Sequence, residues 1–203
     1  MSTRNRISGA LAFILPVLAI AWITPGYSAN LPDADTVLLV ARPEFRDPMY
    51  GETILIARSM GQGRHVGFIL NRPTKFSLAE AFPDHGPSKA VTSPLYLGGP
   101  AEVNAVFALV ASSSSPGRGS IQLSPEVFLV IAADTVDHVI ETEAQHARFF
   151  AGAVVWQPGE LEQELKRGAW YVLDPEPDLV LPQKTEGMWQ QLVHRAELRE
   201  NGI

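Results

Sequence analysis

The stretch Val66-Gly67-Phe68-Ile69-Leu70-Asn71-Arg72-Pro73 (VGFILNRP) carries the clearest local pattern of the chain. Its first five residues are apolar or glycine, which predicts a buried β-strand over residues 66–70. Pro73 has no backbone N–H and biases Arg72 toward extended geometry. We therefore expect the sheet to end at the corner formed by Asn71, Arg72 and Pro73.

Two apolar runs before this strand extend the predicted sheet. Residues 36–41 (TVLLVA) and 53–57 (TILIA) are short and rich in β-branched side chains, as buried strands are. Gly61-Gln62-Gly63 lies between the second run and residues 66–70, and glycine supplies the positive φ that a tight turn needs. These two strands are therefore expected to form a hairpin. Residues 42–51 hold two prolines and are expected to be a loop.

The rest of the chain alternates strands and helices. Further strands are expected over 95–97, 106–111, 121–123, 127–132, 149–156 and 170–173. Helices are expected after a capping box at Ser77 and Glu80, from the N-cap Asp134 to Thr142, over 158–167, and around Trp189 near the C-terminus.

This order predicts one α+β domain over residues 29–203, with a mixed, largely antiparallel sheet and helices packed on it. The side chains expected in its core are Leu38, Val40, Ile54, Ile56, Phe68, Leu70, Phe107, Leu129, Val154 and Trp156.

Residues 1–28 have the layout of a secretory signal peptide. Two arginines precede an apolar run of 14 residues, Ala10–Ile23, and small residues at Gly26 and Ser28 follow it. The run is shorter than the roughly 20 residues of a membrane span. We expect cleavage after Ser28, with cleavage after Ala29 as the second choice because it puts bulky Tyr27 at a small-residue position, and a periplasmic or secreted mature chain. The alternative is an uncleaved leader that anchors the chain in the inner membrane.

Composition excludes several classes of function. The chain has 203 residues, of which 46% are hydrophobic and 19% charged, so it is not an intrinsically disordered protein. It has no cysteine, which excludes disulfides, thiolate metal sites and cysteine nucleophiles. Without the two leader arginines, 14 basic residues face 22 acidic ones, a net charge of −8. A nucleic-acid partner is therefore not expected.

No local motif for metal, cofactor or nucleophile chemistry is present. None of the five histidines lie three or four residues apart, and G-x-S-x-G and S-x-x-K are both absent. Gly61-Gln62-Gly63 and Gly98-Gly99-Pro100 lack the companion residues of phosphate-binding loops and indicate turns. Glu160 and Glu164 share one helical face, which favours a solvated surface over an acid–base pair. We expect no cofactor and no metal.

Four motifs follow one another along the chain: LVARP with RDP (39–48), GFILNRP (67–73), LGGP (97–100) and GELEQE with a tryptophan (159–170). In this order and spacing they resemble the AlgH/YqgE family over essentially the whole mature chain. The resemblance implies a compact α+β fold and a suspected role in gene regulation in bacteria. It brings no agreed catalytic reaction.

The chain departs from this family pattern in three places. Basic Arg58 and Arg64 flank a turn that is often acidic in the family. Residues 106–110 (VFALV) lack the glycine and histidine of a G-F-x-L-H stretch. Family members usually look cytoplasmic, whereas this chain begins with an export leader, and a working leader argues against direct control of transcription.

The corner at Asn71 and Arg72 is the strongest candidate site. The forked guanidinium of Arg72 suits a carboxylate or phosphate ligand. The alternative is an internal salt bridge from Arg72 to Asp47, which would hold the 42–51 loop against the sheet. Gly98, Gly99 and Glu160 complete the set of candidate ligand or structural residues.

Two functions are consistent with these residues. The first is an exported, non-catalytic binding or regulatory module whose partner is a protein or a small anionic ligand. The second is an enzyme that acts on a small anionic substrate with a dispersed site of Arg72, Asp47 and Glu160. Convergence of these side chains in one concave pocket would favour the enzyme, and neutralisation of Arg72 by an acid would favour the module.

Overall fold

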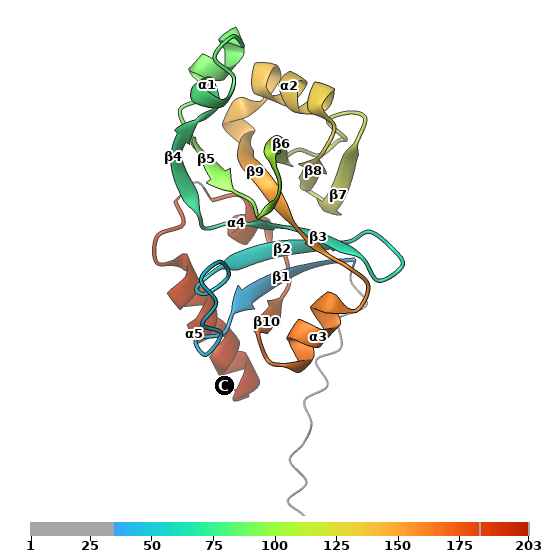
Figure 1. Ribbon diagram of the computed structural model, residues 1–203, viewed down its shortest axis with the longest axis vertical. Coiled ribbons are helices and arrows are strands. Elements are labelled where there is room, and N and C mark those ends of the chain that lie inside the picture. Colours follow the sequence, from blue (N-terminus) through green and yellow to red (C-terminus); the bar gives the residue numbers. More distant parts are fainter. Residues whose placement is uncertain (1–34, 183, 203) are drawn as a thin grey trace, which may run out of the picture.

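The computed structural model describes residues 35–182 and 184–202 (Figure 1). The expected leader lies outside these residues. The strands are β1 (Thr36–Ala41), β2 (Ile54–Ser59), β3 (His65–Ile69), β4 (Pro73–Ser77), β5 (Pro94–Leu97), β6 (Ala101–Ala111), β7 (Ser120–Ser124), β8 (Val127–Val130), β9 (Ala147–Trp156) and β10 (Trp170–Leu173). The α-helices are α1 (Leu78–Ala81), α2 (Ala133–Thr142), α3 (Glu160–Lys166), α4 (Pro177–Val180) and α5 (Met188–Glu200), and short 3-10 turns span Gly86–Ala90 and Ala144–His146.

Strand β9 joins two groups of strands. Most of the sheet follows the order β10-β1-β2-β3-β9-β6-β8-β7, and β5 pairs with both β4 and β9. The first half of β9 lies between β5 and β6, with Phe150 opposite both Tyr96 and Phe107. Its second half pairs with β3, where Val154 lies opposite Gly67. Figure 1 shows β9 running from the group near α2 to the group near α3. The fold is α+β with a largely antiparallel sheet, as the sequence predicts.

Strand β1 is buried on both faces, which explains its uninterrupted apolar sequence. Leu38 and Val40 pack in the same cluster as Leu192 of α5, whereas Leu39 packs with Leu161 of α3 on the opposite face. A third cluster packs α2 against β6 and β8. Nine of the ten expected core side chains are buried, and Phe107 is only partly buried.

Three expectations about the elements are wrong. The sheet does not end at Pro73, because Pro73 is the first residue of the edge strand β4, where a missing N–H costs no ladder bond. Strand β6 begins at Ala101, five residues earlier than expected. Ala132 is the N-cap residue of α2, and Asp134 lies in its first turn beside Arg118. The proline-rich segment before α5 contains the short helix α4. In the described residues, no helix is long and apolar enough to cross a membrane.

Candidate functional site

The loop between β1 and β2 is held rigid by Asp47. The Asp47 carboxylate accepts hydrogen bonds from the backbone N–H groups of Met49 (2.8 Å) and Tyr50 (2.9 Å). The N–H of Gly51 donates to the Asp47 carbonyl at 2.8 Å. This aspartate turn fixes residues 47–51 by hydrogen bonds within the loop itself.

The corner after β3 holds the other end of the same loop. The Asn71 side chain accepts a hydrogen bond from the Ile54 N–H and donates one to the Glu52 carbonyl, both at 2.9 Å. The Arg72 guanidinium donates to the Gly51 carbonyl at 2.8 Å. Three of the six candidate residues, Asp47, Asn71 and Arg72, therefore hydrogen-bond to the backbone of one loop. Their observed role is to hold that loop in place.

The predicted salt bridge between Arg72 and Asp47 is wrong. No ion pair joins them, although both residues belong to the described part of the chain. Asp47 is occupied by the amides of its own turn, and Arg72 is half-exposed and bound to a carbonyl. Arg72 is not a fully buried charge, so it does not require an acidic partner.

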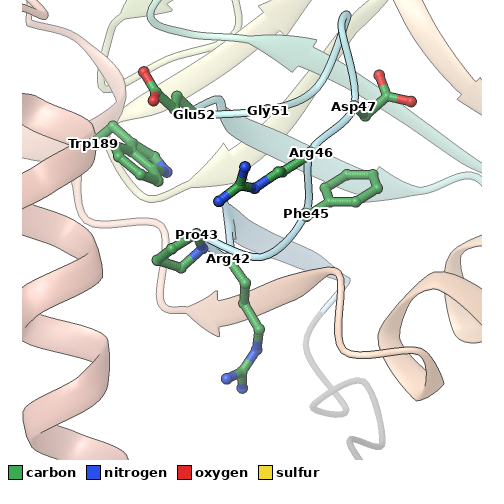
Figure 2. A pocket seen from close by; sticks show the side chains of 8 residues that line it. All are labelled: Arg42, Pro43, Phe45, Arg46, Asp47, Gly51, Glu52 and Trp189. Atoms are coloured by element: carbon green, nitrogen blue, oxygen red, sulfur yellow. The ribbon is translucent and has the colours of Figure 1, made fainter.

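A hollow of about 410 Å³ opens between this loop and α5. Its volume lies within the range of small-molecule sites. Figure 2 shows Arg46 directed across the hollow toward Trp189, with Glu52 beside Trp189. The residues that line it are Arg42, Pro43, Phe45, Arg46, Asp47, Gly51, Glu52 and Trp189.

Two of the four charged side chains that line the hollow already have partners. Arg42 forms a two-pronged ion pair with Glu200 and stacks over the ring of Tyr171, 3.9 Å from its centroid. Asp47 holds its own turn, and Figure 2 shows its carboxylate directed away from the hollow. Within the described residues, the guanidinium of Arg46 and the carboxylate of Glu52 form no hydrogen bond or ion pair. Both are exposed.

Gly98 and Gly99 directly follow β5, and both pack against the backbone of β9. A Cβ atom on Gly98 would lie 2.1 Å from the Gly152 carbonyl oxygen, and one on Gly99 would lie 2.3 Å from Ala153 backbone atoms. Any side chain would separate the two backbones. The Gly98 carbonyl also accepts a hydrogen bond from the Ile69 N–H at 2.8 Å.

Glu160 and Glu164 differ in their surroundings. Glu160 is exposed at the start of α3, where it accepts a hydrogen bond from the Gln157 N–H, and it does not line the hollow. Glu164 accepts hydrogen bonds from the indole N–H groups of Trp156 (3.0 Å) and Trp170 (2.8 Å). The expectation of a solvated Glu160–Glu164 face is wrong for Glu164, which joins two buried tryptophans.

Phe45 connects these tryptophans to the hollow. Its ring packs edge-on against Trp170, with 5.2 Å between the ring centroids. The ring of Tyr50 also packs edge-on against Trp170, with a centroid distance of 6.3 Å. Burial, with the nearby charges of Glu164 and Asp47, raises the pKa of Tyr50. Tyr50 is therefore neutral near pH 7.

Arg148 is a buried cation that the sequence does not single out. It is 1% exposed, donates to the Val180 carbonyl at 2.7 Å and to the Leu70 carbonyl, and lies over the ring of Tyr96. Burial is the main cause that lowers its pKa. Arg148 thus joins β9, α4 and the end of β3 beside the Asn71 corner.

A serine, a histidine and a glutamate meet near α2. The Ser88 Oγ lies 2.7 Å from Nδ1 of His85, whose Nε2 lies 3.7 Å from a Glu141 carboxylate oxygen. Ser88 is 0% exposed, so its hydroxyl cannot reach a substrate in this structure. Among the described residues, no cluster of three or more histidine or acidic side chains fits a metal ion.

Comparison with known proteins identifies the family. A family model described as AlgH-like matches residues 38–200. The chain belongs to the AlgH-like family. Among curated relatives of this AlgH-like chain, a UPF0301 protein of Chlorobaculum tepidum is 30% identical over 159 residues, covering 77% of this chain and 83% of that protein. A UPF0301 protein of Streptomyces coelicolor is 26% identical over 165 residues, which cover 78% of this chain and 84% of that protein.

Solved structures support the same fold for this AlgH-like chain. The solution structure of the AlgH protein from Pseudomonas aeruginosa matches with a TM-score of 0.67 at 23% identity, over 82% of this chain and 90% of that one. The crystal structure of protein DIP2367 from Corynebacterium diphtheriae matches with a TM-score of 0.65 at 22% identity, over 82% of this chain and 88% of that one. At this identity the likeness concerns the fold alone.

Sequence reasoning missed three residues that face the hollow: Arg46, Glu52 and Trp189. Arg46 lies in the RDP motif, so its position was a usable signal. Trp189 fits the apolar spacing expected of the C-terminal helix, and the structure places it half-buried against the core. Nothing in the sequence marks Glu52, whose role depends on its backbone conformation.

Proposed function

We propose that this AlgH-like chain is a non-catalytic binding module whose ligand is a small molecule with an anionic group. The observation that carries this proposal is the unpaired guanidinium of Arg46 in the hollow between the 42–52 loop and α5. Arginine presents a rigid fork of donors that matches a carboxylate or phosphate. A cation without a partner beside a concave surface is suited to an anionic ligand.

The loop is organised before any ligand binds. Asp47, Asn71 and Arg72 hold its backbone through hydrogen bonds of 2.8–2.9 Å. Trp189 is fixed by a hydrogen bond of 2.8 Å that its indole N–H donates to the Ala41 carbonyl. A rigid site loses little conformational entropy when it binds, which favours affinity.

A binding role fits the hollow better than a catalytic one. The lining contains no serine, threonine or histidine, and the His85–Ser88 pair lies outside it. We therefore expect no turnover of the ligand.

Export remains part of the proposal. The leader over residues 1–28 supports a working place outside the cytoplasm. Cell fractionation with sequencing of the mature N-terminus tests this: a chain that begins at Ala29 in the periplasm supports export, and a cytoplasmic chain that begins at Met1 contradicts it.

Binding is tested by titrating the mature protein with phosphate, benzoate and 3-phenylpropionate while following the intrinsic tryptophan fluorescence, to which Trp156, Trp170 and Trp189 contribute. We expect saturable quenching with at least one anion, and a loss of affinity of at least tenfold in Arg46→Ala. Arg64→Ala is the matched control, because Arg64 is an exposed arginine that does not line the hollow. Equal affinity of the Arg46→Ala and Arg64→Ala variants, or no binding of any of the three anions or of L-phenylalanine, which also carries a carboxylate, would overturn the proposal.

A further inference from the structure

The hollow also presents an unpaired negative charge on an unusual backbone. Glu52 has φ of +58°, in the left-handed region that non-glycine residues seldom adopt. Asn71 binds its carbonyl and the neighbouring Ile54 N–H, and Arg72 binds the Gly51 carbonyl. Such strain persists only where the surroundings fix it, and it concentrates at functional sites.

The two unpaired charges are kept apart from each other. Arg46 and Glu52 line the same hollow, but they lie beyond ion-pair distance, so neither neutralises the other. The hollow therefore offers one positive and one negative group to a ligand. An anion without a positive group would leave the Glu52 carboxylate unpaired beside another negative charge, which is unfavourable.

Two aromatic side chains form part of the wall of the hollow, and both are held in place by neighbouring groups. The indole of Trp189 is held by Ala41, and Phe45 is held edge-on by Trp170. A planar hydrocarbon group can pack on such a wall.

From this arrangement we infer that the ligand is a zwitterion of the amino-acid type: a carboxylate bound by Arg46, an ammonium group bound by Glu52, and an apolar side chain against Trp189. This inference rests on the proposed function and names the chemical class of its ligand. Glu52 is then the residue that selects an amino acid over a simple carboxylate.

Isothermal titration with three matched probes tests the inference: L-phenylalanine, 3-phenylpropionate, which lacks the ammonium group, and phenethylamine, which lacks the carboxylate. We expect phenylalanine to bind at least tenfold more tightly than either analogue. In Glu52→Gln, phenylalanine should lose this advantage over 3-phenylpropionate. In Arg46→Ala, it should lose its advantage over phenethylamine.

Glu102→Gln is the matched control for Glu52→Gln. Glu102 is an exposed glutamate with φ of +52°, and it lies outside the hollow. We expect it to leave all three affinities unchanged. Thermal melts of each variant establish that the protein is folded before titration.

The outcomes separate the inference from the function on which it rests. If 3-phenylpropionate binds as tightly as phenylalanine and Glu52→Gln changes neither, the zwitterion is excluded and the anion site stands. If phenethylamine alone binds, or if none of the probes binds at millimolar concentration, both the inference and the proposed function are overturned.

Discussion

Asn71 supplies both side-chain hydrogen bonds that attach the Glu52–Ile54 turn to the end of β3. In Asn71→Ala the Ile54 N–H and the Glu52 carbonyl lose their partners, and the left-handed Glu52 loses its main support. We expect a loss of about 2 kcal/mol in the free energy of unfolding, since a typical hydrogen bond contributes about 1 kcal/mol. Urea denaturation measures this loss.

Asn104→Ala is the control for that experiment. Asn104 is exposed in β6, and a surface substitution away from special contacts changes stability by less than about 0.5 kcal/mol. Equal urea-denaturation midpoints for Asn71→Ala and Asn104→Ala would show that Asn71 does not hold the turn.

The site could be predicted from sequence only in part, and the reason is visible at single residues. Asn71 and Asp47 lie in recognisable motifs, and both shape the loop that borders the hollow. Their partners are backbone atoms, which a sequence does not distinguish, so the Arg72–Asp47 pair is a reasonable but wrong expectation. Arg46 and Trp189 come from segments more than 140 residues apart, and only the folded chain shows that they face one hollow.

At the scale of elements, the capping box of α1 gives a pH-dependent contribution. Glu80 accepts hydrogen bonds from the N–H and hydroxyl of Ser77, and these bonds lower the pKa of Glu80. A carboxyl whose pKa is lower when folded stabilises above its unfolded pKa, and this contribution disappears as the pH falls through the folded pKa.

We therefore expect Ser77→Ala to be slightly less stable than the parent protein at pH 7, and this difference to shrink as the pH falls through the lowered pKa of Glu80 and its carboxylate is protonated. Thermal melts of both proteins at pH 7, 5 and 3 check this. A difference that stays constant across the series would contradict the role of the Glu80 charge.

The chain that follows β5 packs so closely against β9 that Gly98 tolerates no side chain. Because a Cβ on Gly98 would meet the Gly152 backbone at 2.1 Å, we expect Gly98→Ala to destabilise the protein by about 3 kcal/mol or more. Gly86→Ala is the control, since nothing lies within 4 Å of its Cβ position and its φ is not positive. Chemical denaturation of the two variants compares them, and similar stabilities would show that the strands can separate without cost.

Most elements could be predicted because their patterns are local. β1 is a continuous apolar run, and α3 ends before Gly168, which has φ of +72°. The wrong expectations concern elements whose form depends on partners distant in the sequence. Pro73 begins a strand because β5 lies beside it, and β6 extends back to Ala101 because it pairs with β9 across an irregular register.

For the whole molecule, β9 determines how the chain unfolds. It pairs with β3 in one group of strands and with β5 and β6 in the other. Loss of β9 would remove a partner from both groups, so we expect one cooperative unfolding transition. Native-state hydrogen exchange should give the slowest amides in residues 148–155, with the same opening free energy for β3 and β6. A group of strands that opens well below this free energy would contradict a single unit.

The position of β9 along the chain also bears on the proposed export. A ribosome makes every strand of both groups except β10 before it makes residues 147–156, so until then β3 and β6 lack their shared neighbour. Strand pairing between distant segments is slow because the loop must close first. We therefore expect the two groups of strands to remain unjoined until β9 has been made. Such a delay would suit the proposed export, because a chain that crosses a translocation channel does so before it folds.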